Sequence, residues 1–242
     1  MPRKRANNSG FPGEGSAPPG LDDALRLVCI TPPAPLAPDR FELSVREAVD
    51  GGATAVMLRH PGLNAAELTA RGRLLAGLAG ELGFLFILNG SPEAAVEAGA
   101  GGVHLGSRTV GPAEARAFLD AHRGPGELRF LIGCSIHYPF ENHLAAIASC
   151  DYITYSPVFS TSSKKGAKPL GVDELRRAVD SLRQPVVALG GIAAGEARVL
   201  ARAGCRGVAV ISSVFGSGDP RQNARLLRRA FEEIEKTGEK RI

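Results

Sequence analysis

The 242-residue sequence predicts an α/β fold, a single (β/α)8 barrel of the TIM-barrel type. Eight short apolar runs alternate with segments whose apolar residues recur at helical spacing. The runs show little apolar–polar alternation, which is typical of parallel strands covered on both faces. The joints VDGGATAVML, VEAGAGGVHL and ARAGCRGVAV resemble one another, each with a glycine where a helix ends. A chain of this length suits one such barrel.

The elements follow one another in a regular order. The expected strands cover residues 27–31, 55–60, 84–89, 102–106, 130–136, 152–159, 185–191 and 207–212. Helical spacing is clear over 41–52, 65–83, 112–124, 172–184 and 195–205. An open doubly wound sheet is the alternative, but TPPAPLAP follows the first strand where that fold would carry GxGxxG.

The two ends of the chain differ in composition from its centre. Residues 1–22 are rich in Pro, Gly, Ser and Asn, so we expect a disordered tail that buries too little apolar surface to fold. The barrel is expected over 23–236, with a short C-terminal tail at 237–242.

Charge and composition exclude several classes of function. The chain has 29 Lys and Arg against 25 Asp and Glu, a balance that predicts no nucleic-acid-binding face. No apolar window of about 18 residues occurs, so no membrane span is expected. The N-terminus lacks the apolar core of a secretory signal. Four cysteines without a CxxC pair indicate buried free thiols and a cytoplasmic protein. The oligomeric state stays open, a homo-oligomer included.

The last two strands end in ALGGI and AVISSVF. In a (β/α)8 barrel the loops after these strands commonly form a phosphate site. Backbone N–H groups at Gly190, Gly191, Ile211 and Ser212 are therefore candidate phosphate ligands. The alternative is that the two glycines only permit a sharp turn.

The stretch VFSTSSKKG follows the sixth strand. Lys164 and Lys165, together with the hydroxyls of Thr161, Ser162 and Ser163, could hold a pyrophosphate through charge-assisted hydrogen bonds. A solvent-facing loop is the alternative interpretation.

Other polar residues stand at strand ends. Arg59 suits an anionic substrate, Asn89 offers a neutral amide, and Ser135 a hydroxyl. His104, between two apolar residues, is interpreted as structural, and His60 as a surface histidine. No strand end carries the carboxylate that Mg²⁺ normally requires, and no metal-ligand spacing occurs.

Seven segments together resemble the thiamine phosphate synthase family, with its TenI-like thiazole tautomerase relatives, over about residues 27–215. They are AVMLR, LFILNG, GAGGVHLGS, IGCSIH, YSPVFSTSSKKG, PVVALGGI and GVAVISSVF. The resemblance implies a transferase of thiamine biosynthesis whose partners are small phosphorylated heterocycles. It would join hydroxymethylpyrimidine pyrophosphate to thiazole phosphate, with pyrophosphate leaving first.

The resemblance also implies roles for particular residues. Catalytic positions would be Lys164, Ser135 and Arg59. Substrate-binding positions would be Asn89, Thr161 and Ser163, and the phosphate cup would comprise Gly190, Gly191, Ile211 and Ser212.

The sequence departs from the family pattern in three places. Synthases resemble QxREK at the second strand, where this chain has MLRHP. They hold Mg²⁺ with two aspartates, whose places are taken here by Gly90 and Thr109. Tautomerases carry a catalytic histidine where this chain, like the synthases, has Pro157.

Three hypotheses follow from this pattern. The favoured one is a thiamine phosphate synthase-like transferase, with charge handled by Lys164, Lys165, Arg59 and Arg108. The others are a tautomerase that uses His60 or His137, and a non-catalytic barrel that binds phosphorylated ligands.

Overall fold

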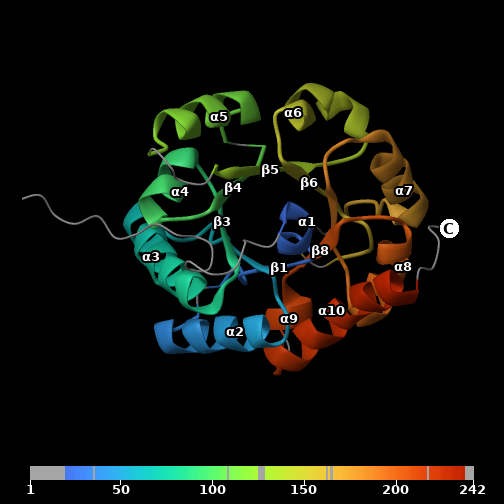
Figure 1. The fold of residues 1–242 in the computed structure, drawn as a ribbon, viewed down its shortest axis with the longest axis horizontal. Coiled ribbons are helices and arrows are strands. Elements are labelled where there is room, and N and C mark those ends of the chain that lie inside the picture. Colours follow the sequence, from blue (N-terminus) through green and yellow to red (C-terminus); the bar gives the residue numbers. More distant parts are fainter. Residues whose placement is uncertain are drawn as a thin grey trace, which may run out of the picture.

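Eight parallel strands form a closed barrel in which each strand pairs with its neighbours in chain order, β1 to β8 (Figure 1). The predicted (β/α)8 fold is thereby confirmed. This computed structural model describes residues 20–34, 36–107, 109–124, 129–161, 163, 166–216 and 218–237.

The strands agree closely with the eight expected runs. They are β1 (Leu27–Ile30), β2 (Ala55–Leu58), β3 (Leu85–Asn89), β4 (Gly102–Leu105), β5 (Leu131–Ile136), β6 (Tyr152–Tyr155), β7 (Val186–Leu189) and β8 (Gly207–Val210). The largest difference is in β6, which ends at Tyr155 rather than at residue 159. Pro157 follows, and a residue without an N–H cannot donate to the strand ladder.

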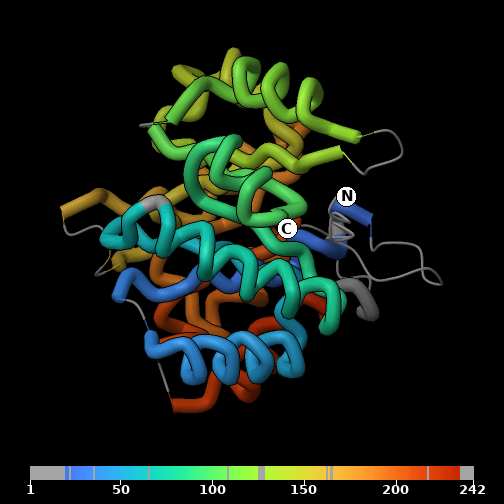
Figure 2. Tube along the Cα trace, turned by 90° about the vertical axis from the view of Figure 1, so that its left-hand side faces the viewer, coloured from blue at the N-terminus to red at the C-terminus, as the bar shows by residue number. Residues whose placement is uncertain are grey.

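Helices surround the barrel, and Figure 2 shows the successive helices α2 to α5 lying along its outer surface. None of the described helices is long and apolar enough to cross a membrane. The helical elements are α1 (Leu21–Ala24), α2 (Pro38–Asp50), α3 (Ala65–Leu82), α4 (Pro92–Ala98), α5 (Pro112–Ala121), η1 (Phe140–His143), α6 (Leu144–Ala148), α7 (Gly171–Ser181), α8 (Ala194–Arg202), α9 (Ser212–Phe215) and α10 (Pro220–Thr237).

The glycines at three helix-to-strand joints have the backbone conformation that the sequence pattern predicts. Gly52, Gly99 and Gly204 all have positive φ, at 109°, 75° and 85°. Both expected tails extend beyond the described residues, which begin at Gly20, just before α1, and end with α10.

The core has two layers because successive side chains of a strand point to opposite sides of the barrel wall. The outer layer lies under the helices and includes Cys29 and Phe86. The inner layer fills the barrel with residues such as Val28, Ile87 and Tyr152. Leu25 belongs to the inner layer, and α1 lies at the centre of the ring of strands (Figure 1). Since α1 directly precedes β1, it closes the end of the barrel where the strands begin.

Towards the carboxyl ends of the strands, the inward positions change from apolar to polar. The register pairs Asn89 with His104, and Ser135 with Thr154, across neighbouring strands. Their immediate neighbours Cys134 and Tyr155 belong to the outer layer. Strand alternation therefore places a polar layer on top of the apolar interior.

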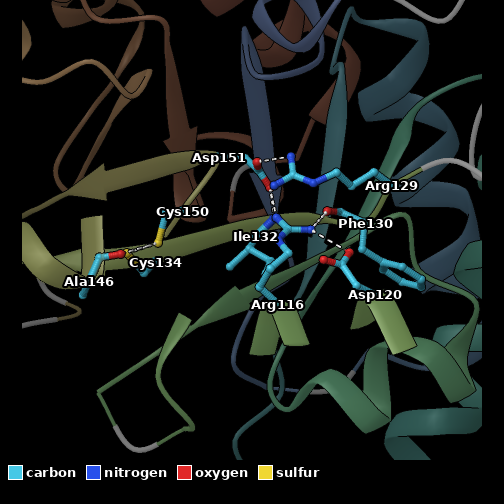
Figure 3. Close-up of polar contacts among 9 residues, drawn as sticks. All are labelled: Arg116, Asp120, Arg129, Phe130, Ile132, Cys134, Ala146, Cys150 and Asp151. Carbon is cyan, nitrogen blue, oxygen red and sulfur yellow. Dashed lines mark hydrogen bonds and ion pairs between the residues drawn. The ribbon is translucent and has the colours of Figure 1, made fainter. Parts of the chain in front are cut away.

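The carboxylate of Asp151 joins the amino-terminal ends of β5 and β6 (Figure 3). It accepts hydrogen bonds from Arg116, from Arg129 at 2.7 Å and from the backbone N–H of Ile132 at 2.7 Å. The Asp151 side chain is only 11% exposed. This carboxylate therefore connects α5 and the start of β5 to the start of β6.

All four cysteines are buried free thiols, which confirms that expectation. Cys134 and Cys150 lie beside the Asp151 cluster, with their sulfur atoms 2.8 Å apart (Figure 3). The Cys150 thiol also donates to the carbonyl of Ala146 at 3.3 Å.

We expect Asp151→Asn to lower the free energy of unfolding by about 1–3 kcal/mol, because the mostly buried Arg116 would lose its nearest carboxylate. Urea-induced unfolding measures this change. Asp173→Asn is the matched control, since Asp173 is fully exposed and its ion pair with Arg176 is long, at 3.8 Å, and it should change stability much less. Equal effects of the two substitutions would contradict the role assigned to Asp151.

Candidate active site

A pocket opens at the carboxyl ends of the strands, above the polar layer. It brings together every described residue of the expected synthase site: Arg59, Asn89, Ser135, Thr161, Ser163, Gly190, Gly191, Ile211 and Ser212. Lys164, Lys165, Arg108 and Ser162 lie outside the described residues.

Two of the candidate residues are held by hydrogen bonds to neighbouring strands, Arg59 through its backbone and Asn89 through its side chain. The backbone N–H of Arg59 donates to the Thr31 hydroxyl at 2.9 Å, and that hydroxyl donates to the Arg59 carbonyl at 3.2 Å. The Arg59 side chain is exposed at the mouth of the pocket. The Asn89 amide donates to the carbonyl of His104 at 3.1 Å, which fixes its orientation.

Both ring nitrogens of His104 are hydrogen-bonded, as expected for a structural histidine. His104 also lines the pocket floor, which the sequence interpretation did not predict. Its Nδ1 lies 3.0 Å from the Tyr152 hydroxyl and its Nε2 lies 3.0 Å from the Ser135 hydroxyl. Burial lowers the pKa of His104 to about 3, so the ring is neutral at physiological pH. Thr154, whose hydroxyl is 3.3 Å from Nε2, also lines the pocket and was also missed.

The signal for His104 and Thr154 is the two-residue alternation of strands. The apolar neighbours of His104 face the helices, so the residue between them must face the barrel interior. In β6, Thr154 lies two residues after Tyr152, on the same inward side.

The loops after β7 and β8 form the opposite wall. Gly190 and Gly191 have φ of +105° and +67°, a region that side chains rarely adopt. The Ser213 hydroxyl donates to the carbonyl of Ile192 and thereby joins the two loops. The first turn of α9 leaves early backbone N–H groups without helical acceptors, as every helix does.

The loop after β6 is attached to the same wall. Val158 N–H donates to the Leu189 carbonyl and Phe159 N–H to the Gly190 carbonyl, both at 3.0 Å. Thr161 and Ser163 lie further along this loop, where the Ser163 N–H donates to the Thr161 hydroxyl at 3.3 Å. This arrangement places their side chains beside the glycine pair.

The charges of the described lining residues favour an anion. Arg59 is a cation, His104 is neutral, and none of these residues is Asp or Glu. An anionic ligand would therefore meet no carboxylate from this part of the lining.

The described residues do not fit a protein-held magnesium ion. None of them forms a group of three or more His, Cys, Asp or Glu side chains that could hold a metal. Gly90 has no side chain, and the Thr109 hydroxyl already donates to the Gly106 carbonyl at 2.8 Å. Carboxylate oxygens, which Mg²⁺ prefers, are absent from these two positions.

The other two candidate histidines do not line this pocket. The expectation that His60 lies on the surface is wrong, because the residue is only 6% exposed. Burial, aided by Arg71, lowers the pKa of His60. His137 is exposed at the end of β5, where its Nδ1 lies 2.9 Å from the Ser156 carbonyl oxygen.

Comparison with known proteins identifies relatives over most of the chain. A model of the family described as thiamine monophosphate synthase matches residues 27–214. The thiamine-phosphate synthase of Xanthobacter autotrophicus is 36% identical over 207 residues, covering 85% of this chain and 95% of that protein. The thiamine-phosphate synthase of Pyrococcus furiosus is 35% identical over 191 residues, covering 79% of this chain and 88% of that protein.

Solved structures agree. Thiamine phosphate pyrophosphorylase from Pyrococcus furiosus superimposes with a TM-score of 0.77 at 33% identity, covering 89% of this chain and 99% of that one. A 3-hexulose-6-phosphate synthase, at 15% identity and a TM-score of 0.65, shares the fold alone; it covers 85% of this chain and 99% of that one. From the family match and these relatives, we conclude that the chain belongs to the thiamine monophosphate synthase family.

Proposed function

We propose that this pocket joins hydroxymethylpyrimidine pyrophosphate to thiazole phosphate, forming thiamine phosphate and releasing pyrophosphate. The observation that carries the proposal is the convergence of the nine described residues of the expected synthase site on one pocket, whose described lining holds no carboxylate. The names of the relatives, which are thiamine-phosphate synthases, support this substrate class.

The reaction makes modest demands on acid–base groups. The bond between the pyrimidine methylene carbon and the pyrophosphate oxygen breaks, and its electron pair leaves with the pyrophosphate. The thiazole nitrogen then donates its lone pair to the methylene carbon, giving a thiazolium product. No proton has to move in either step. The principal requirement is stabilisation of negative charge on the leaving group.

In this proposal, Arg59, Ser135 and Lys164 stabilise the departing pyrophosphate. Arg59 is at the mouth of the pocket and Ser135 on its floor, and Lys164 directly follows the lining residue Ser163 in the sequence. Asn89, Thr161 and Ser163 would hold the pyrimidine-bearing substrate. Charge-assisted hydrogen bonds from cations and hydroxyls are suited to a polyanion.

The cup formed by Gly190, Gly191, Ile211 and Ser212 would bind the phosphate of the thiazole substrate. Support comes from the positive φ of the glycine pair and from the first turn of α9, which begins at Ser212. Backbone N–H groups in such turns bind phosphate without a cation.

Three observations weigh against a tautomerase. Pro157, which cannot act as a base, lines the pocket at the place of the tautomerase histidine. The described histidines His60 and His137 do not line it. His104, the histidine among the described lining residues, is a weak base because burial lowers its pKa to about 3.

The direct test is to incubate the purified protein with both substrates and measure thiamine phosphate and pyrophosphate. We expect the two products in equal amounts. Lys164→Ala should weaken binding of the pyrophosphate-bearing substrate by roughly tenfold or more, while binding of thiazole phosphate changes little.

A protein that binds thiazole phosphate but yields no thiamine phosphate, with or without Mg²⁺, would contradict the proposed activity. Equal loss of affinity for both substrates in Lys164→Ala would contradict the role given to that lysine.

Gly191→Ala should weaken binding of thiazole phosphate by roughly tenfold or more, since a methyl group at this φ is strained. The new Cβ would also overlap the Ser160 carbonyl oxygen and come within 2.9 Å of Phe159 Cβ. Isothermal titration calorimetry measures the affinity. Gly195→Ala is the control, because a Cβ there meets nothing within 4 Å and the residue is in helix α8. Unaltered affinity in Gly191→Ala would exclude the cup.

The metal site can be tested by restoring carboxylates. The double variant Gly90→Asp with Thr109→Asp should lower the Mg²⁺ concentration that gives half-maximal activity. A Cβ at Gly90 meets only the flexible end of Leu88, at 2.8 Å, so the change is sterically tolerable. Gly90→Asn with Thr109→Asn matches it in shape without the charge. An identical Mg²⁺ dependence in both double variants would exclude these two positions as metal ligands.

A further inference from the structure

A chain of hydrogen bonds extends from the buried interior of the barrel to the pocket floor. It runs from the Tyr152 hydroxyl to Nδ1 of His104, and from Nε2 of His104 to the Ser135 hydroxyl, each step at 3.0 Å. The Thr154 hydroxyl lies 3.3 Å from the same Nε2 and donates to Ser135 Oγ at 3.4 Å. Only the Ser135 end of this chain is partly exposed.

A neutral imidazole carries one proton, so only one of the two His104 nitrogens can donate. Tyr152 decides which one. Its side chain is fully buried, and His104 Nδ1 is the only hydrogen-bond partner of its hydroxyl among the described residues. If Nδ1 carried the proton, the phenolic O–H would be buried without an acceptor, which is unfavourable. The phenol therefore donates to Nδ1, and the His104 proton is on Nε2.

The proton on Nε2 determines how the Ser135 hydroxyl points. Nε2–H donates to Ser135 Oγ, and the Thr154 hydroxyl donates to the same oxygen. A hydroxyl oxygen has two acceptor positions, and both are then filled from within the barrel. The remaining group of Ser135, its O–H, is left to point into the pocket.

We propose that Tyr152 and His104 are positioning residues that make the Ser135 hydroxyl a hydrogen-bond donor to the anion in the pocket. With the opposite tautomer, Ser135 would donate to Nε2 and present oxygen lone pairs to that anion. The inference rests on the proposed function in taking pyrophosphate as the anion.

The same geometry gives Gly133 a role. It precedes Ser135 by two residues on the inward side of β5, and a Cβ there would overlap the ring of Tyr152. The absence of a side chain at Gly133 therefore makes room for the phenol that orients His104. This Ser–His pair also differs from that of a serine hydrolase, in which the histidine accepts the serine proton. A protonated Nε2 cannot accept it.

The tautomer can be observed directly in the unmodified protein. Two-bond ¹⁵N–¹H correlation spectra of ¹⁵N-histidine-labelled protein distinguish a protonated Nε2 from a protonated Nδ1. We expect His104 to carry its proton on Nε2, and a proton on Nδ1 would overturn the proposal. This measurement needs neither a variant nor an active enzyme.

A double-mutant cycle tests the coupling, with inorganic pyrophosphate as the probe in calorimetric titrations. Ser135→Ala should weaken pyrophosphate binding by roughly tenfold or more, as expected for a lost bond to an anion. Tyr152→Phe, which keeps the ring beside Gly133, should weaken it by roughly fivefold. In the Ser135→Ala background, Tyr152→Phe should have no further effect. Additive losses, or no pyrophosphate binding at all, would overturn the proposal.

Tyr155→Phe is the matched control. Tyr155 is another fully buried tyrosine of β6, but its hydroxyl donates to Glu174 at 2.7 Å, on the outer side of the barrel. Tyr155→Phe should lower stability without changing pyrophosphate affinity. If it lowered the affinity as much as Tyr152→Phe does, the effect of Tyr152 would be a general loss of stability and the positioning role would be refuted.

Failure of the proposed function gives a different result. A protein that makes no thiamine phosphate, yet has a protonated Nε2 and a non-additive cycle, would refute the synthase activity and retain the positioning role.

Discussion

Closing eight parallel strands into a ring forces all their carboxyl ends to one rim, and alternation along each strand sorts the side chains there. Adjacent residues of a strand therefore face different surroundings. Cys134 faces the helices while Ser135 faces the pocket, and likewise Tyr155 faces the helices while Thr154 faces the pocket. The apolar interior supports this rim, and the Asp151 carboxylate joins the amino-terminal ends of β5 and β6. The site is therefore a consequence of how the ring closes, and no single loop builds it.

The rim provides groups that bind anions and few groups that can transfer protons. The described lining combines Arg59, several hydroxyls and the backbone turn around Gly191, and its imidazole stays neutral. A reaction driven by the departure of pyrophosphate needs these groups and no base. Gly90 and Thr109 supply no carboxylate, so among the described residues the charge of an anionic ligand would be met by Arg59 and by hydroxyls.

Much of this could be predicted from the sequence because it depends on local rules. Strand ends identify Arg59, Asn89 and Ser135, and paired glycines identify the loop after β7. The place of His104 in the pocket is harder to predict, because its apolar neighbours suggest burial and only strand alternation shows that it faces inward. His60 was misjudged because a residue beside a proline resembles an exposed loop, whereas its burial depends on distant parts of the chain. The contact between Tyr152 and Gly133 is likewise long-range and leaves no sequence pattern.

Helix α1 has a consequence for the side from which ligands reach the pocket. It closes the end where the strands begin, and the fully buried Leu25 and Tyr152 fill the space behind the polar layer. In the part of the chain that the structure describes, the barrel is therefore closed behind the site, and ligands reach His104 and Ser135 from the carboxyl ends of the strands. A group that rests on Ser135 exchanges with solvent past the residues of the pocket wall.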